Sequence, residues 1–336
     1  MKRSFYLLLL LSAVLLLAAQ CAPDGDDNGG GEDPAPPARV VVPKFNSDSA
    51  YAFVAKQVAF GPRNPNSEGH RQCGDWIASK LKGYGAQVVE QPFQAEAYTG
   101  LKMDGRNIIG SFYPERSIRV VLAAHWDTRF IAEEDDNEAI QDDPILGADD
   151  GGSGVGVLLE IARQLSENDM PNWGVDLVFF DLEDQGEREN ENNVDSWCLG
   201  SQHWSRNPHV YGYSPVYGIL LDMVGSKGAR FTKERISMIY APSVMDMVWR
   251  EAQSLGYGNY FVNTMTGGIT DDHYYVNTIA QIPMIDIINK QGNAASGFSD
   301  HWHTHDDDMD IIDPATLRAV GRTVMTVLFR DAAGEI

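Results

Sequence analysis

Three histidines occupy alternate positions in FSDHWHTHDDDMD, residues 298–310, and a run of aspartates follows them. Imidazole and carboxylate groups bind metal ions and act as general acids and bases. On a strand, His301, His303 and His305 would share one face, which would allow a three-histidine metal site. A calcium loop and a single working histidine are the alternatives.

A calcium loop of the EF-hand type does not fit these aspartates. Such loops need glycine at the sixth position and glutamate at the twelfth, and DDDMDIIDPATL has neither. A second acidic segment, EEDDNE at residues 133–138, is interpreted as a solvated insertion near the mouth of a site.

Carboxylates and one imidazole follow three apolar runs. The pairs are IRVVLAA with His125 and Asp127, VDLVFF with Asp181, Glu183 and Asp184, and VYGILL with Asp222. A single aspartate after a strand is ordinarily a cap or turn residue. Three strands that deliver such groups to one sheet edge indicate a ligand site, because open α/β sheets bind ligands beyond the carboxyl ends of their strands.

The loop LGADDGGSG, residues 146–154, adds Asp149 and Asp150 just before a helical pattern. A helix N-terminus favours one aspartate but does not explain two. Aspartate, glutamate and histidine together are the ligands of a zinc site that keeps one position open for substrate.

The elements that position these residues are read from hydrophobic periodicity. Strands are predicted at residues 86–98, 106–113, 118–124, 175–181, 216–225 and 282–288. Helices are predicted at 47–60, 67–85, 153–165 and 313–332, the last with Asp313 as N-cap and Pro314 at its first position. This alternation predicts an α/β fold with a mixed, mostly parallel central sheet flanked by helices on both faces. Because no repeat or second linker interrupts it, residues 39–336 are predicted to form a single domain.

The N-terminus reads as a targeting segment. Lys2 and Arg3 precede LLLLLSAVLLLAA, which is shorter than the ~20 apolar residues of a membrane-spanning helix. We therefore predict a lipoprotein signal at residues 1–20, lipidation of Cys21, and an acidic Gly/Pro-rich linker over residues 21–38. The expected location is the bacterial cell envelope, as a periplasm-facing lipoprotein anchored to a membrane. An ordinary secretory signal is the alternative, since Gln20 stands where a small residue is usual.

Charge and cysteine content limit the partners and the chemistry. The net charge of −22 argues against nucleic acid, which requires clustered Lys and Arg. In an oxidising compartment Cys73 and Cys198 could pair or remain free and buried, and neither belongs to a recognisable Cys/His catalytic arrangement.

Six motifs carry a family resemblance. HWDTR, GADDGGSG, FFDLEDQGE, LLDMVG, TDDH and WHTHDD occur in the order found in the zinc aminopeptidase and glutaminyl cyclase superfamily. The resemblance runs from residue 59 to the end and implies a zinc exopeptidase-like fold.

The two branches of the superfamily imply different metal sites. The aminopeptidases hold two metal ions, and their ligand pattern maps onto His125, Asp150, Asp184, Asp222 and His303. The glutaminyl cyclases hold one zinc ion, and their matching ligands are Asp150, Asp184 and His303. Residue types alone permit both.

Several details resemble the bacterial type of glutaminyl cyclase. Glu183-Asp184 stands where cyclases usually have two adjacent glutamates, and Trp302 precedes the ligand histidine. TDDH contains the paired aspartates of the cyclases. The resemblance therefore implies a glutaminyl-peptide cyclotransferase that acts on peptides and proteins with N-terminal glutamine. A two-zinc aminopeptidase remains the alternative, and a non-catalytic binding lipoprotein is a third hypothesis, against which no gap is seen in the site.

The resemblance also implies a role for each residue. Glu183 would be the proton shuttle, Asp222 and Asp272 a hydrogen-bonded acid pair, and Trp302 and Trp197 walls of the substrate pocket. His125 and Asp127 would be a ligand and its orienting partner in a two-zinc enzyme, and supporting residues in a cyclase. His301 and His305 would then flank the single ligand His303.

Overall fold

The computed structural model describes residues 39–290 and 297–336. The signal, Cys21 and the linker predicted for residues 1–38 lie outside the described residues. From Arg39 to Ile336 the chain forms one compact unit. Within the described ranges, no helix is both long enough and apolar enough to cross a bilayer.

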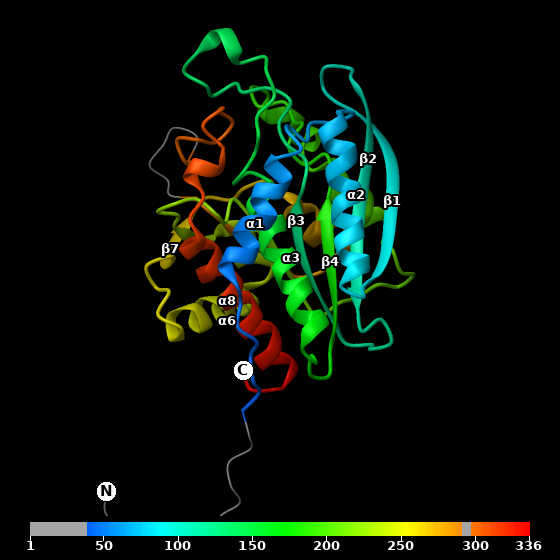
Figure 1. Ribbon diagram of the computed structural model, residues 1–336, viewed down its shortest axis with the longest axis vertical. Helices are drawn as coiled ribbons and strands as arrows, with labels where there is room; N and C mark the ends of the chain where they lie inside the picture. The colour runs from blue at the N-terminus through cyan, green and yellow to red at the C-terminus, as the bar shows by residue number, and fades with distance from the viewer. Residues whose placement is uncertain (1–38, 291–296) are drawn as a thin grey trace, which may run out of the picture. The chain divides into compact units, whose positions relative to one another are not determined.

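A six-stranded sheet in the order β1-β2-β4-β3-β5-β8 forms the centre of this unit (Figure 1). The strands are β1 (Gln87–Glu96), β2 (Lys102–Phe112), β3 (Arg119–His125), β4 (Gly174–Phe180), β5 (Gly218–Asp222) and β8 (Met284–Ile288). β4, β3, β5 and β8 run parallel, and β1 and β2 are antiparallel to their neighbours. The predicted mixed, mostly parallel sheet is therefore confirmed.

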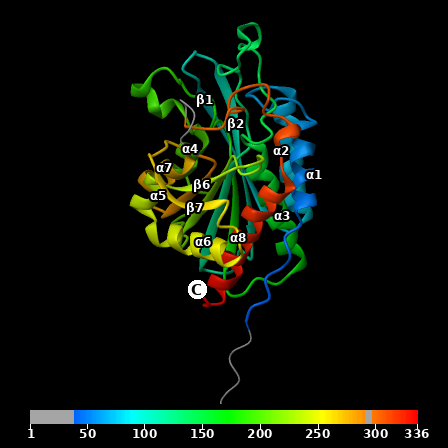
Figure 2. The ribbon, with the colours of Figure 1, turned by 90° about the vertical axis from the view of Figure 1, so that its left-hand side faces the viewer.

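Helices cover both faces of the sheet (Figure 2). One face carries α1 (Ser47–Val58), α2 (Glu68–Gly83), α3 (Gly152–Glu167) and α8 (Pro314–Ala332). The other carries α4 (Leu199–Arg206), α5 (Arg235–Tyr240) and α7 (Asp272–Tyr275). Asp313 caps α8 through Ala315 N, as predicted, because its carboxylate satisfies an N–H that has no partner inside the helix.

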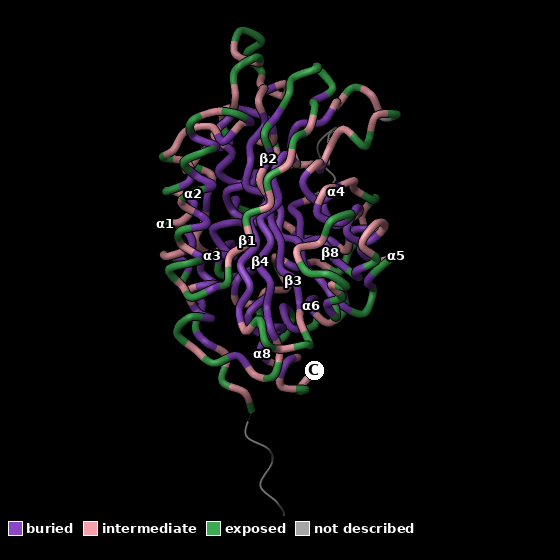
Figure 3. Tube along the Cα trace, turned by 90° about the vertical axis from the view of Figure 1, so that its right-hand side faces the viewer, coloured by how far each residue is buried: buried purple, intermediate pink, exposed green. Residues whose placement is uncertain are grey.

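The parallel strands β3, β4, β5 and β8 are buried because both of their faces are covered, as Figure 3 shows for the centre of the unit, whereas the outer strand β1 is partly exposed. The larger hydrophobic core lies on the α1–α3 side and contains Leu122 and Phe179. The smaller core lies on the other side, where Val178 and Phe180 pack with Trp204 of α4. The continuous apolar runs of the sequence result from this two-sided burial.

Glycines allow α3 to approach the sheet closely. Gly151, which precedes α3, has a φ of 76°, and a Cβ at Gly154 would come within 2.3 Å of the Leu221 carbonyl oxygen. A side chain at either position would push the helix away from β5 or strain the turn. The GGSG sequence thus fixes the loop that carries Asp150 against the end of β5.

No helix or strand was predicted for the segment between residues 226 and 280. It forms β6 (Phe231–Glu234), α5, α6 (Pro242–Ser254) and β7 (Phe261–Thr266), and β6 pairs with β7 in a separate parallel sheet. These strands have only four and six residues, so their alternation is too short to identify.

Candidate active site

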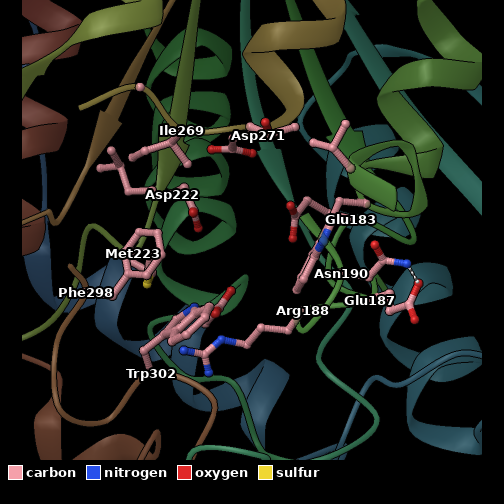
Figure 4. A pocket seen from close by; sticks show the side chains of 16 residues that line it. Glu183, Glu187, Arg188, Asn190, Asp222, Met223, Ile269, Asp271, Phe298 and Trp302 are labelled. Atoms are coloured by element: carbon pink, nitrogen blue, oxygen red, sulfur yellow. Dashed lines mark hydrogen bonds between the residues drawn. The ribbon is translucent and has the colours of Figure 1, made fainter. Parts of the chain in front are cut away.

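A cavity of about 480 Å³ opens at the carboxyl ends of β3, β4 and β5. Its lining includes Asp150, Glu183, Asp222 and Asp271. Figure 4 shows the carboxylates of the last three directed toward the cavity. The structure therefore brings strand-end acids together at one sheet edge, where the sequence analysis expected a polar site.

Asp150, Asp184 and His303 form a buried group whose ligand atoms lie within 4.8 Å of one another. His303 Nε2 is 2.9 Å from Asp184 Oδ1 and 3.8 Å from Asp150 Oδ2. Asp184 Oδ2 is buried without a hydrogen-bond donor, which is costly unless a cation binds it. Two carboxylates and one imidazole are the ligands of a catalytic zinc site with an open position, so these residues fit zinc.

The second ring nitrogen of His303 is also engaged. His303 Nδ1 lies 3.0 Å from Glu133 Oε1, and the same carboxylate accepts hydrogen bonds from Arg129. Burial lowers the pKa of His303, but the charge of Asp184 and the hydrogen bonds to Asp184 and Glu133 raise it to about 9. Glu133 was predicted to lie in a solvated insertion. That prediction is wrong for Glu133, which is half-buried and orients the ring of the histidine.

Glu183 is held beside the group of Asp150, Asp184 and His303 by the loop after β4. Glu183 N and Asp184 N donate to the two oxygens of Asp127, at 3.1 and 3.2 Å. Burial raises the pKa of Glu183 well above its ordinary value, and nearby carboxylates add to this effect while His125 opposes it. A carboxyl group with a raised pKa beside a metal site is suited to accept and return a proton.

The acid pair needs a correction by one residue. Asp271, and not Asp272, lines the cavity with Asp222, while Asp272 is fully buried. Burial and then the charge of Asp222 raise the pKa of Asp271 to about 6. The backbone explains why Asp271 and not Asp272 faces the cavity. Asp271 is the N-cap of α7 and has an extended conformation, whereas Asp272 is the first helical residue.

His125 makes a second carboxylate–histidine group. Its Nε2 lies 3.0 Å from Asp150 Oδ1 and 3.2 Å from Asp222 Oδ1, and the ligand atoms of the three residues lie within 4.8 Å of one another. Asp150 thus belongs to both groups. All five residues of the two-metal pattern therefore lie together, around the shared carboxylate of Asp150.

The histidines on either side of His303 do not reach this metal group. His301 Nε2 contacts Asp149 Oδ2 at 3.2 Å, and His305 Nδ1 contacts Asp135 Oδ2 at 3.0 Å. His303 itself has a φ of 56°, so the stretch is a turn and not a strand. The three histidines therefore diverge, which leaves His303 as the one that faces Asp150 and Asp184.

Asp307 fixes the loop that carries Asp150. Its two oxygens accept from Asp149 N at 2.7 Å and from Asp150 N at 3.0 Å. Burial and the charges of Asp149 and Asp150 raise the pKa of Asp307 to about 8. Nothing in the local sequence reveals this contact, because the partners lie 158 and 157 residues away along the chain.

Both predicted tryptophans line the cavity. The Trp302 ring stacks on the His303 ring with 3.7 Å between their centroids, and Trp197 lies 6.1 Å from the same ring at an interplanar angle of 16°. Arg129 lies over the Trp197 ring and Arg188 over the Trp302 ring, at 4.7 and 4.8 Å. His303 is consequently bordered by flat aromatic walls.

Cys73 and Cys198 are both free and buried. This settles the question that the sequence left open about their pairing. Cys198 Sγ lies 3.2 Å from Glu183 Oε1, a contact that no motif indicates.

Comparison with known proteins adds independent findings. The sequence profile of peptidase family M28 matches residues 107–328. A solved Zn-dependent exopeptidase from Parabacteroides distasonis is 53% identical, with a TM-score of 0.84 over 86% of this chain and 99% of that one. The solved glutaminyl cyclase of Porphyromonas gingivalis is 52% identical, with a TM-score of 0.82 over 84% of this chain and 98% of that one. A curated relative, the glutaminyl-peptide cyclotransferase of Bothrops jararaca, is 24% identical over 283 residues, covering 76% of this chain and 73% of the relative.

Proposed function

The chain belongs to peptidase family M28, and we propose that within this family it is a zinc-dependent glutaminyl-peptide cyclotransferase. It converts the N-terminal glutamine of peptides and proteins to pyroglutamate and releases ammonia. Its 52% identity to the P. gingivalis glutaminyl cyclase, over 98% of that chain, supports this assignment.

The observation that carries the proposal is the closeness of two acidic groups on the cavity wall. A carboxylate oxygen of Glu183, one of Asp271 and the Cys198 sulfur lie within 4.8 Å of one another. In the cyclisation, the attacking α-amine and the leaving amide nitrogen belong to the same glutamine. Both proton transfers therefore take place on one glutamine residue of the substrate. Two carboxyl groups as close together as those of Glu183 and Asp271 can reach both nitrogen atoms.

Asp150, Asp184 and His303 are the residues that would hold a single zinc ion. The chemistry supplied by zinc there is Lewis-acid polarisation of the side-chain amide carbonyl and stabilisation of the negative charge that develops on its oxygen. The unsatisfied Asp184 Oδ2 and the orientation of His303 by Glu133 support this assignment.

Glu183 moves the proton. As the α-amine nitrogen bonds to the amide carbon, Glu183 accepts the proton that the amine loses. The same proton then passes to the amide nitrogen as its bond to the carbon breaks, so that ammonia leaves and Glu183 is regenerated. Such a shuttle contributes about 10²–10⁴-fold to the rate.

Asp222 and Asp271 act on the leaving-group side. Both are buried and face the same cavity; burial raises the pKa of each, and the charge of Asp222 adds to the shift at Asp271, so a second negative charge there is disfavoured. Trp302 and Trp197 form the walls against which the apolar part of the glutamine side chain packs.

Two peptides that differ only in the first residue test the function. With a Gln-initiated peptide, mass spectrometry should show loss of ammonia without cleavage, and a Leu-initiated peptide should be unchanged. The Nα-acetylated Gln peptide is the matched control, because it has no nucleophilic amine and must not react. Release of free N-terminal residues from either peptide would instead establish an aminopeptidase.

The second candidate is a two-zinc aminopeptidase, which the His125–Asp150–Asp222 group favours. In that enzyme Glu183 would activate water to hydrolyse the first peptide bond. Elemental analysis separates the two, because about one zinc per chain fits the cyclase and about two fit the aminopeptidase. Removal of zinc with a chelator should abolish the activity, and zinc addition should restore it.

We also propose a location for the protein, and the N-terminal sequence supports it. Cleavage before Cys21 and lipidation of that residue would anchor the catalytic unit to a membrane of the cell envelope through the linker over residues 22–38. The active site would then face periplasmic peptides and proteins with N-terminal glutamine.

A further inference from the structure

We propose that Cys198 is a positioning residue for Glu183, whose carboxylate its thiol holds in the orientation required for proton transfer. This inference rests on the function proposed above for Glu183. Cys198 Sγ lies 3.2 Å from Glu183 Oε1, within hydrogen-bonding distance for sulfur. Cys198 is fully buried, whereas Glu183 lines the cavity, so the contact is shielded from the side of the thiol.

The thiol is the donor in this hydrogen bond. Burial raises the pKa of Cys198 well above its ordinary value, and the charge of Glu183 raises it further, so the sulfur keeps its proton. A carboxylate oxygen can only accept. The same protonation makes Cys198 a poor nucleophile, which agrees with a supporting role.

The thiol distinguishes the two oxygens of Glu183. Oε1 receives the hydrogen bond from Cys198, whereas Oε2 lies 3.9 Å from His125 Nδ1. The side chain of Glu183 is 12% exposed. A carboxylate fixed at one oxygen cannot rotate freely, so the other oxygen keeps its direction during proton transfer.

The backbone places the thiol there at a conformational cost. Cys198 N donates to Glu183 O at 2.8 Å, and Leu199 N donates to Leu182 O at 3.0 Å. Leu182 and Cys198 have φ values of 56° and 57°, in the left-handed region that disfavours residues other than glycine. A glycine at residue 198 would relieve the backbone strain but would remove the hydrogen-bond donor. The contact with Glu183 therefore requires a side chain in this strained conformation.

Three substitutions test the contact. Cys198→Ala and Cys198→Gly should lower kcat about 3- to 10-fold, because each removes one hydrogen bond to a charged group, while KM and zinc content stay unchanged. Cys198→Ser should restore kcat to within about threefold of the wild type, because its hydroxyl also donates. Cys198→Gly should be at least as stable as Cys198→Ala, since glycine adopts the left-handed φ without strain.

The matched control is Cys73→Ala, which removes an equally buried free thiol from the main core in α2. It should leave kcat unchanged even if it lowers stability. The inference is overturned if Cys198→Ala keeps wild-type kcat, or if Cys198→Ser is as slow as Cys198→Ala.

These results are separable from a failure of the proposed function. The wild-type protein alone tests pyroglutamate formation. If it hydrolyses peptides instead, the same kcat ratios are measured on hydrolysis, where Glu183 would also be the base. Infrared spectroscopy gives a readout without turnover: the S–H band lost in Cys198→Ser should lie at lower frequency than the band lost in Cys73→Ser. An equal or higher frequency would contradict the hydrogen bond.

Discussion

Glu133 Oε1 lies 3.0 Å from Nδ1 of His303, whose Nε2 faces Asp184 at 2.9 Å. A carboxylate from an acidic surface segment thus fixes the ring of the histidine that turns its other nitrogen to the metal group. Partners of this kind orient a ligand histidine and increase its basicity.

The first prediction concerns this orientation. Glu133→Ala should weaken zinc binding about 10- to 100-fold, because His303 loses the partner that fixes its ring. The affinity is measured by competition with a chromogenic chelator. Glu138→Ala, an exposed position in the same segment, is the control and should bind zinc as the wild type does. Equal affinities for the two variants would remove Glu133 from the metal site.

The second prediction concerns the base. Glu183→Gln should lower kcat by at least about 10²-fold, because the amide cannot accept the proton of the attacking amine. Zinc content should remain at the wild-type level, since Glu183 is not among the three proposed ligands. Glu96→Gln, at the end of the outer strand β1, is the control for loss of one carboxylate. A Glu183→Gln variant with full activity would refute the assignment of the base.

The third prediction separates two neighbouring aspartates. Asp271→Asn should lower kcat about 10²-fold, because Asp271 faces the cavity with Asp222. Asp272→Asn should change kcat much less and act mainly on stability, since Asp272 is buried away from the cavity lining. Both variants are compared by steady-state kinetics and by denaturant unfolding. The opposite order of kcat values would return the catalytic role to Asp272.

The fourth prediction concerns stability against pH. Burial raises the pKa of Asp176, but the nearby His209 and hydrogen bonds from Arg119, Ser111 and Tyr213 outweigh this effect and lower the pKa below the ordinary 3.8. The ionised group therefore stabilises the fold above the unfolded-state pKa, and this contribution disappears as the pH falls through the folded-state pKa.

Asp176→Asn should accordingly lower the free energy of unfolding by about 3 kcal/mol at pH 7, because it removes the buried counter-charge of the partly buried Arg119. The difference from the wild type should narrow as the pH falls below about 4. Urea unfolding at a series of pH values measures both effects, with the exposed Asp169→Asn as the control. A difference that stays constant from pH 7 to pH 3 would contradict the lowered pKa.

The fifth prediction concerns the anchor. Cys21→Ala should abolish incorporation of labelled fatty acid and release the enzyme from the membrane fraction, while the activity of the purified protein stays unchanged. Fractionation followed by an activity assay measures the release. A Cys21→Ala protein that still carries the label would require another site of lipidation.

Sequence patterns identified the side chains whose position depends only on the type and bounds of a helix or strand. Buried strands are visible as apolar runs, so the acids at their carboxyl ends were located correctly, and motif order added Asp150, Asp184 and His303. The contacts that depend on how loops fold back were not visible. Glu133 reaches a histidine 170 residues away, and Asp307 reaches a backbone 158 residues away.

The choice between Asp271 and Asp272 was a failure of another kind. Adjacent residues differ in direction only through local φ and ψ, and one residue of offset exchanges an inward side chain for one that points elsewhere. Cys198 was missed for a similar reason, because its left-handed conformation aims the thiol at Glu183 and no sequence pattern predicts that conformation for cysteine.

Asp150 contacts both His125 and the side of the site occupied by His303, whereas each histidine belongs to one carboxylate–histidine group only. A substitution at Asp150 consequently disables both groups at once and reveals nothing about either. Substitutions of the two histidines separate the groups. Loss of His303 removes one ligand from the Asp150–Asp184–His303 group, and loss of His125 removes one from the His125–Asp150–Asp222 group. A change in the number of bound ions during evolution would therefore require the fewest other changes if it altered the surroundings of His125. The backbone and the shared carboxylate of Asp150 would then stay in place.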